Sequence, residues 1–235
     1  MKIKLVSYSQ PSDDFLNEGL EDVQDLIAYC ARVSNPSNQF NTETSTKLLN
    51  YLAKHAHWSP FEMVSACLEI ETTRDIARQI LRHRSFSFQE FSQRYADPTK
   101  DLEFTLREAR LQDPKNRQNS ISLNIEDIGK GGEASVSTPE ERLFIQWNEK
   151  QKDVIRAARD AYTWAVNNGI AKEQARAVLP EGNTVSRLYM NGTIRSWIHY
   201  IELRGANGTQ KEHIQIAKAC AEVIAKIFPL AEDLV

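Results

Sequence analysis

The chain has 235 residues, 41% hydrophobic and 26% charged, which is enough to bury a large core in one domain or a compact pair. Its formal net charge of −3 at pH 7 argues against a protein that holds nucleic acid mainly through bulk positive charge. The sequence has no apolar run long enough to cross a bilayer and no signal-peptide pattern, so we expect a cytoplasmic protein.

The three cysteines, Cys30, Cys67 and Cys220, are far apart and lack metal-ligand spacing. An odd number of isolated cysteines argues against a disulfide framework or a zinc ribbon. Each has apolar or small neighbours, so we predict that all three pack in the core.

Hydrophobic periodicity predicts the elements of the first half of the chain. Ile3–Tyr8 is typical of a short strand, and helices are expected over Leu20–Ser34 and about Thr42–His55. Residues Met63–Thr73 alternate between apolar and polar side chains, which predicts a half-buried strand. From Arg74 to about His83 the period becomes helical.

The second half begins with a polar stretch, about 99–137, in which periodicity disappears, so we expect a surface excursion. Thr138, Pro139 and Glu141 form a helix-start signature. The apolar stripe of the following helix comprises Leu143, Phe144, Trp147, Val154, Ile155, Ala158, Tyr162 and Ala165, and the helix ends at the sequence NNG.

The remaining elements are a short helix over Ala171–Pro180, a strand over Asn183–Met190 and two helices. The first of these helices, Gly192–Gly205, buries Ile194, Trp197, Ile198 and Ile201. The last has a capping box from Thr209 to Glu212 and is expected to bury Ile214, Ala217, Ala221, Ile224 and Phe228. The fold class is therefore α+β: helix-dominated with a small antiparallel sheet, which we expect to form a single domain over residues 1–235.

Positive charge is concentrated around the stretch LRHRSFSFQEFSQRY, Leu81–Tyr95. Arg74, Arg78 and Arg82 share one stripe of the predicted helix, where Asp75 is the only carboxylate. Arginines without acidic partners, followed by Ser85, Ser87, Ser92 and Arg94, favour a local phosphate or other anion site. A solvated cationic face is the alternative. The aromatic residues of this region, Phe86, Phe88, Phe91 and Tyr95, are predicted to pack rather than to stack on a ligand.

Two other functions stay open at this point. A nucleic-acid-binding module would use Arg74 to Arg94 and the phenylalanines on phosphates and bases. A metal-dependent hydrolase would use His55, His57, Glu62 and His83, although nothing in the sequence fixes a third ligand beside the two histidines.

The segment RHRSFSFQEFSQR is similar to the signature of flavin-dependent thymidylate synthases, Arg-His-Arg, seven residues, Ser, any residue, Arg. Further segments resemble that family in the same order: CARVS, HAHWSPFE, QARAVLP and MNGTIRSWIHYIELR. The resemblance covers most of the chain except 99–137. It implies methylation of dUMP to dTMP with methylenetetrahydrofolate as carbon donor, FAD as hydride carrier and NADPH as reductant.

The resemblance also implies roles for individual residues. The expected FAD contacts are Ser59, Arg82, His83, Arg84, Glu90, Arg195 and His199. The expected dUMP contacts are Gln79, Arg82, Glu90, Ser92, Gln93, Arg94 and Arg176. His57 is either a further flavin contact or a structural residue. Arg204 resembles the arginine placed against the uracil, where a fixed positive charge stabilises negative charge that develops on the ring.

The expected mechanism has no cysteine nucleophile, because no cysteine lies in a basic, hydroxyl-rich segment. Ser92 is expected to bind phosphate, since no histidine base is fixed beside it in the sequence. No glycine-rich dinucleotide fingerprint occurs among the 9 glycines, so FAD must bind without a Rossmann unit. In the family that it resembles, FAD lies between the subunits of a homotetramer, so we expect sites shared between subunits and neither a metal, a nucleic acid nor a membrane as partner.

Overall fold

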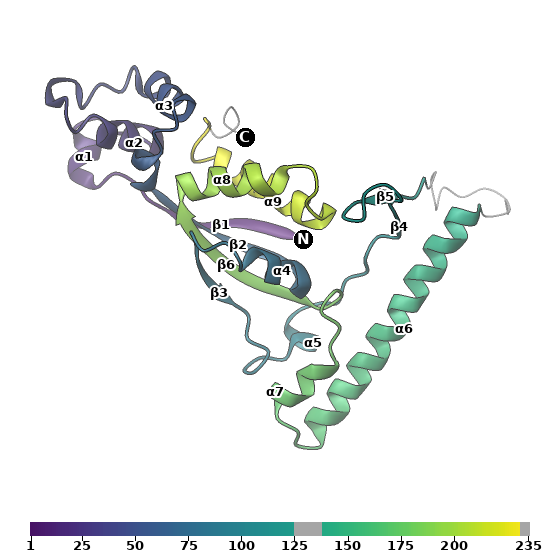
Figure 1. Ribbon diagram of the computed structural model, residues 1–235. Coiled ribbons are helices and arrows are strands. Elements are labelled where there is room, and N and C mark those ends of the chain that lie inside the picture. The colour runs from purple at the N-terminus through teal and green to yellow at the C-terminus, as the bar shows by residue number, and fades with distance from the viewer. Residues whose placement is uncertain (125–137, 231–235) are drawn as a thin grey trace, which may run out of the picture. The chain divides into compact units, whose positions relative to one another are not determined.

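The computed structural model describes residues 1–124 and 138–230 (Figure 1). The chain forms two compact units. The first comprises Met1–Glu71, Ile80–Glu90 and Arg187–Val235, and the second comprises Thr72–Gln79 and Phe91–Ser186. The single domain expected from the sequence stays a prediction. No helix within the described ranges is long and apolar enough to span a membrane.

A four-stranded sheet confirms the small antiparallel sheet. Its strands are β1 (Lys2–Tyr8), β2 (Ser65–Thr73), β6 (Val185–Thr193) and β3 (Ser87–Glu90), in that order across the sheet. Val64 and the alternate β2 residues Ala66, Leu68 and Ile70 are buried, as the alternation predicts. β3, a strand of four residues that pairs antiparallel with β6, was not predicted from the sequence.

Helices complete the first unit. They are α1 (Asp13–Asn17), α2 (Val23–Ala31), α3 (Ser45–Lys54), α8 (Ile194–Gly205) and α9 (Lys211–Ala225), with 3-10 turns η1 (Pro36–Asn38) and η2 (Ser59–Glu62). α8 and α9 pack against each other (Figure 1). The predicted apolar face of α8 is confirmed, because Ile194, Trp197, Ile198 and Ile201 are all buried.

The burial pattern of α9 differs from the prediction by about one residue. The helix begins at Lys211 after Gln210, whose side chain makes no capping hydrogen bond, so the predicted capping box is wrong. The buried positions are His213, Ile216, Ala217, Cys220, Val223 and Ile224, followed by Phe228. Ile214 and Ala221 are only half-buried, because the buried stripe is centred on His213 and Cys220 instead.

The second unit is built around α6 (Pro139–Asn167). Its capping box between Thr138 and Glu141 is present as predicted. The other elements are α4 (Arg74–Ile80), most of which lies in this unit, α5 (Pro98–Asp101), β4 (Arg110–Gln112), β5 (Ser120–Ser122), α7 (Lys172–Ala175) and η3 (Arg176–Val178). Only the C-terminal half of the α6 stripe is buried, since Leu143, Trp147 and Val154 are more than 40% exposed.

The polar stretch at 99–124 is more ordered than its sequence indicated. It contains part of α5 and the β4–β5 hairpin, and Leu102 and Ala109 are buried. Nearby, Phe104 packs against a small core of Tyr162, Ala165, Ala175 and Leu179. The rest of the predicted excursion, 125–137, lies outside the described residues.

α4 is shorter than predicted and ends at Ile80. Arg82 therefore follows the helix, so the stripe of three arginines is wrong. Arg74 is also not solvent-exposed: it is 9% exposed and its Nε lies 3.1 Å from a carboxylate oxygen of Glu181. These two findings correct the view of α4 as an unpaired cationic face.

Candidate functional site

The loop that follows α4 lies along α8 in the first unit. Near the start of α8, the Ser196 hydroxyl donates a hydrogen bond of 3.2 Å to the carbonyl oxygen of Ser85. At the other end of the helix, the Nε–H of Arg204 donates to Nε2 of His83 over 2.8 Å. α8 thus positions both the Arg-His-Arg loop and the arginine expected at the uracil.

The Arg204–His83 contact fixes the protonation of His83. A guanidinium group only donates hydrogen bonds, so the Nε2 atom that accepts must carry no proton. Burial, and secondly the charge of Arg204, lower the pKa of His83. His83 is therefore neutral at neutral pH, and the positive charge of the pair resides on Arg204.

Phe86 anchors the same loop in the core. Its ring lies 4.9 Å from that of Trp197 and 5.9 Å from that of Tyr200, both in edge-to-face geometry. The packing predicted for Phe86 is therefore confirmed. Tyr95, in contrast, is 80% exposed, so its predicted packing is wrong.

Two of the side chains expected near the flavin, Arg195 and His199, lie where α8 contacts η2. Arg195 of α8 forms an ion pair with Glu62 of η2. One turn later in α8, the ring of His199 lies 4.7 Å from that of Trp58, the residue before Ser59. Arg195 and His199 thus contact the segment 58–62, in which Ser59 itself is exposed. His57 is also exposed, and its ring lies 6.4 Å from that of His55.

Arg82 and Arg84 flank His83 and are both exposed. Neither side chain has a hydrogen bond or ion pair with any residue in 1–124 or 138–230. Two guanidinium groups with free donors on either side of a half-buried histidine could bind a phosphate or pyrophosphate in bidentate fashion.

The second unit holds most of the residues expected to bind the nucleotide. Ser92, Gln93 and Arg94 form a turn in which the Ser92 carbonyl accepts from the Tyr95 amide over 3.1 Å. α7 lies against this turn, because Lys172 Nζ donates to the Tyr95 carbonyl over 3.0 Å and Arg94 lies 3.2 Å from Glu173. Arg176 directly follows α7, and its guanidinium has no partner among the described side chains.

Gln93 is 3% exposed and its Nε2 has no hydrogen-bond partner in the described part of the chain. A buried donor without an acceptor is costly, which points to an additional group that accepts from it. Gln79 lies half-buried in the last turn of α4, and Glu90 is half-buried at the end of β3. Both already have interactions in the chain.

Two buried polar groupings were not predicted from the sequence. In the first unit, the hydroxyl of Tyr200 lies 3.0 Å from Nε2 of His213, and both residues are almost completely buried. In the second unit, Arg107 binds both carboxylate oxygens of Asp75 at 2.5 and 2.7 Å and donates from Nε to the Gly182 carbonyl at 2.9 Å. Periodicity reveals neither, because each depends on residues that are distant in the sequence.

The cysteines lie in less reactive settings than a nucleophile needs. Burial raises the pKa of the Cys220 thiol far above its ordinary value, and also raises the pKa of Cys30 and Cys67. Cys220 is buried as predicted, but Cys30 and Cys67 are only half-buried, which corrects the prediction of core packing for all three.

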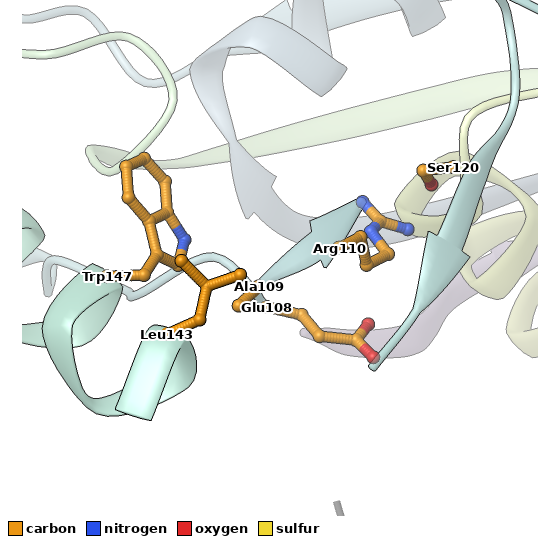
Figure 2. A pocket seen from close by; sticks show the side chains of 6 residues that line it. All are labelled: Glu108, Ala109, Arg110, Ser120, Leu143 and Trp147. Carbon is orange, nitrogen blue, oxygen red and sulfur yellow. The ribbon is translucent and has the colours of Figure 1, made fainter. Parts of the chain in front are cut away.

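A pocket of about 400 Å³ lies in the second unit between α6 and the β4–β5 hairpin. Figure 2 shows Leu143 and Trp147 of α6 on one side and Glu108, Arg110 and Ser120 on the other. None of the predicted site residues lines it. No group of three or more histidine, cysteine or acidic side chains in the described ranges could hold a metal ion, which removes the ligand set of the hydrolase alternative.

Comparisons with known proteins agree with the resemblance found in the sequence. Residues 16–230 match the family described as Thymidylate synthase complementing protein. A protein of Paramecium bursaria Chlorella virus 1, named a probable flavin-dependent thymidylate synthase, is 47% identical over 229 residues, which cover 97% of this chain and 96% of that protein. The flavin-dependent thymidylate synthase of Synechocystis sp. has the same identity and coverage.

A solved structure shows the same fold. The UMP/dUMP methylase from Streptomyces cacaoi, bound with 5-Br dUMP, aligns over 99% of this chain and 93% of its own, with a TM-score of 0.73 and 23% identity. The family match over residues 16–230 and the 47% identity to the two relatives establish that the chain belongs to the flavin-dependent thymidylate synthase family.

Proposed function

We propose that this chain converts dUMP to dTMP, with methylenetetrahydrofolate as carbon donor, FAD as hydride carrier and NADPH as the reductant of the flavin. Membership of the family supports the reaction. The observation that carries the assignment of residues is the Arg204–His83 hydrogen bond, which presents a charged guanidinium beside the Arg-His-Arg loop.

The donors of the first unit fit a flavin dinucleotide. FAD carries a pyrophosphate, and the free guanidinium groups of Arg82 and Arg84 are suited to bind it. Ser59 and His199 would add hydroxyl and imidazole groups, and Arg195 would add a charge that Glu62 partly neutralises. When bound, FAD would supply the hydride that completes the methyl group.

The turn at Ser92–Arg94 and the free guanidinium of Arg176 are proposed to hold dUMP, together with Gln79, Arg82 and Glu90. The phosphate would find two arginines and the Ser92 hydroxyl, and a nucleotide oxygen could accept the unused hydrogen bond of Gln93 Nε2. The Ser92 hydroxyl accepts a hydrogen bond from the Arg94 amide over 3.4 Å and has no basic side chain as a hydrogen-bond partner among the described residues, which supports phosphate binding and not nucleophilic attack.

Arg204 is proposed as the catalytic residue. Neutral His83 accepts the hydrogen bond of Arg204 and so fixes the direction of its guanidinium. A preorganised cation stabilises negative charge on the pyrimidine during the reaction. The raised pKa values of the thiols support activation without a cysteine nucleophile.

We also propose that the protein is a cytoplasmic homotetramer whose sites are shared between subunits. The apolar α6 residues Leu143, Trp147, Val154 and Trp164 are between 42% and 63% exposed in the single chain. An apolar helix face of this kind is typical of a surface that another chain covers. We expect no nucleic acid or membrane as partner.

An assay with omitted components tests the function. Purified protein supplied with FAD, dUMP, methylenetetrahydrofolate and NADPH should form dTMP, measured by chromatography. Omission of dUMP, methylenetetrahydrofolate or NADPH, or removal of the bound flavin, should stop net turnover. Formation of dTMP at the same rate by protein stripped of flavin would contradict the proposal.

A further inference from the structure

We infer that the buried Tyr200–His213 pair is a positioning device for Arg204: it fixes the Tyr200 ring, which holds His83 in the orientation in which Nε2 accepts the Arg204 hydrogen bond. The inference rests on the proposed function, since Arg204 is the catalytic residue of that proposal. Its distinctive claim is that α9, which supplies His213, determines the direction of a guanidinium at the end of α8.

The first step is the contact between His83 and Tyr200. Their rings are 4.9 Å apart at an interplanar angle of 85°, so the imidazole meets the phenol in edge-to-face geometry. Tyr200 lies four residues before Arg204 on α8, which places both on the same face of that helix. The phenol ring of Tyr200 therefore packs against the His83 imidazole and restricts its rotation, while His83 accepts the hydrogen bond of Arg204.

Tyr200 is itself held by His213 of α9. Its hydroxyl lies 3.0 Å from His213 Nε2, and the exposed fractions of the two residues are 1% and 0%. Neither residue can turn to water, so the loss of the His213 imidazole would leave the buried Tyr200 hydroxyl unsatisfied. The ring of His213 is also 6.4 Å from that of His83 and perpendicular to it, which closes the cluster on the α9 side.

The third step concerns charge. The ionisable groups that face this cluster are Arg204, Tyr200, His213, His83 and Cys220. Burial, then Arg204 and His83, lower the pKa of His213 to about 4, and burial raises that of Tyr200 well above its ordinary value. At neutral pH Arg204 is consequently the single charged group among the five.

Loss of the hydrogen bond between Tyr200 and His213 should change the protonation of His83. If the Tyr200 ring loses its anchor, His83 can rotate and become more hydrated, and its bond with Arg204 weakens. Its pKa should then rise toward the ordinary value, because burial and the nearby guanidinium are what lower it. Protonated His83 cannot accept from Arg204, so activity should be lost at a higher pH than in the parent.

The test compares Tyr200→Phe and His213→Leu with the conservative His213→Gln. Tyr162→Phe is the matched control, because the Tyr162 hydroxyl is equally buried but has no hydrogen-bond partner among the described residues. The chain has 5 histidines, so nitrogen-15 NMR of the imidazoles can assign the tautomer of His83 without any ligand. The parent should show an unprotonated Nε2.

We expect Tyr200→Phe and His213→Leu to lose the NMR signal of an unprotonated His83 Nε2. Both variants should lower kcat about tenfold with little change in KM for dUMP. The acid limb of their pH–kcat profiles should move to higher pH. His213→Gln should retain most of the parent's behaviour, and Tyr162→Phe all of it. A protonated Nε2 of His83 in the parent, or a folded Tyr200→Phe with the parent's signal and acid limb, would overturn the inference. If the parent itself forms no dTMP, the proposed function fails, while the NMR result still decides the positioning role.

Discussion

Phe86 lies so close to Gly192 that a β-carbon at Gly192 would stand 2.4 Å from the Cδ1 atom of the Phe86 ring. Gly192 is on β6, and Phe86 follows the Arg-His-Arg loop and packs against Trp197. The absence of a side chain at Gly192 therefore lets the loop reach its place beside α8.

Gly192→Ala should consequently destabilise the protein by about 2 kcal/mol, because the buried phenyl ring cannot move aside without disturbing its neighbours. Chemical denaturation measures the effect. Gly182→Ala is the matched control, since nothing lies within 4 Å of the β-carbon it would add, and its stability should be unchanged or slightly higher. Equal free energies of unfolding for Gly192→Ala and Gly182→Ala would contradict the prediction, because they would show that the Phe86 ring can move aside without cost.

Arg107 should be the main electrostatic anchor of the second unit. Its side chain is 16% exposed and binds Asp75, Thr73 and the Gly182 carbonyl. Arg107→Met should lower the free energy of unfolding by about 3 kcal/mol, because it leaves a half-buried carboxylate without its partner.

Arg156→Met serves as control for Arg107→Met. Arg156 pairs with Asp153 on the surface of α6, and both side chains are more than half exposed. Its loss should change stability by less than about 0.5 kcal/mol. A similar small change for Arg107→Met would contradict the role given to Arg107.

Arg204→Ala should reduce dUMP-dependent turnover by about a hundredfold or more while flavin stays bound, because the charge against the pyrimidine is removed. Arg204→Lys keeps a charge but loses the Nε–H that donates to His83, so its activity should be intermediate. Turnover and flavin absorbance are measured together. Unchanged turnover in Arg204→Ala would exclude Arg204 from the site.

Stability should fall as the solution is acidified below about pH 6.5. Unfolded histidine binds a proton near that pH, whereas burial lowers the pKa of folded His213 to about 4, so acid favours the unfolded state. Protonation of His213 in the unfolded state lowers the free energy of unfolding by about 2 kcal/mol at pH 5, and this loss is absent above pH 7. His213→Leu should show a correspondingly flatter dependence of unfolding free energy on pH, and a dependence as steep as the parent's would refute this assignment.

Cys67→Ala and Cys220→Ala should both keep the turnover of the parent, since burial raises the pKa of each thiol and disfavours the thiolate. Cys220→Ala should lose some stability, because Cys220 is completely buried. A variant that is folded and loaded with flavin but inactive would reopen a thiol mechanism.

Local patterns predicted those parts of the fold in which one face is regularly apolar. β2 alternates over Val64–Ile70 and α8 repeats at helical spacing, so both were predicted with the correct buried residues. The capping box of α6 was equally visible, because all of its partners lie within four residues. β3 was missed because four residues carry too little pattern, and its pairing with β6 depends on residues about a hundred positions later.

The candidate site was predictable only where a motif identified it. The Arg-His-Arg signature indicated the loop beside α8, but the sequence did not show that Arg74 pairs with Glu181, 107 residues away. Arg107 lies in a stretch without periodicity, and His213 occupies a position that the predicted stripe of α9 assigned to the neighbouring Ile214. The contacts of Arg74, Arg107 and His213 all join separate segments of the chain, and no local sequence pattern specifies such contacts.

The central claim is that bound, reduced flavin and the cations of this chain convert dUMP to dTMP. A single-turnover experiment tests it most directly: protein loaded with FAD and reduced in the absence of oxygen is mixed with dUMP and methylenetetrahydrofolate, and dTMP is measured against flavin. The account predicts one dTMP for each flavin that becomes oxidised. Reoxidation of the flavin without formation of dTMP would contradict it.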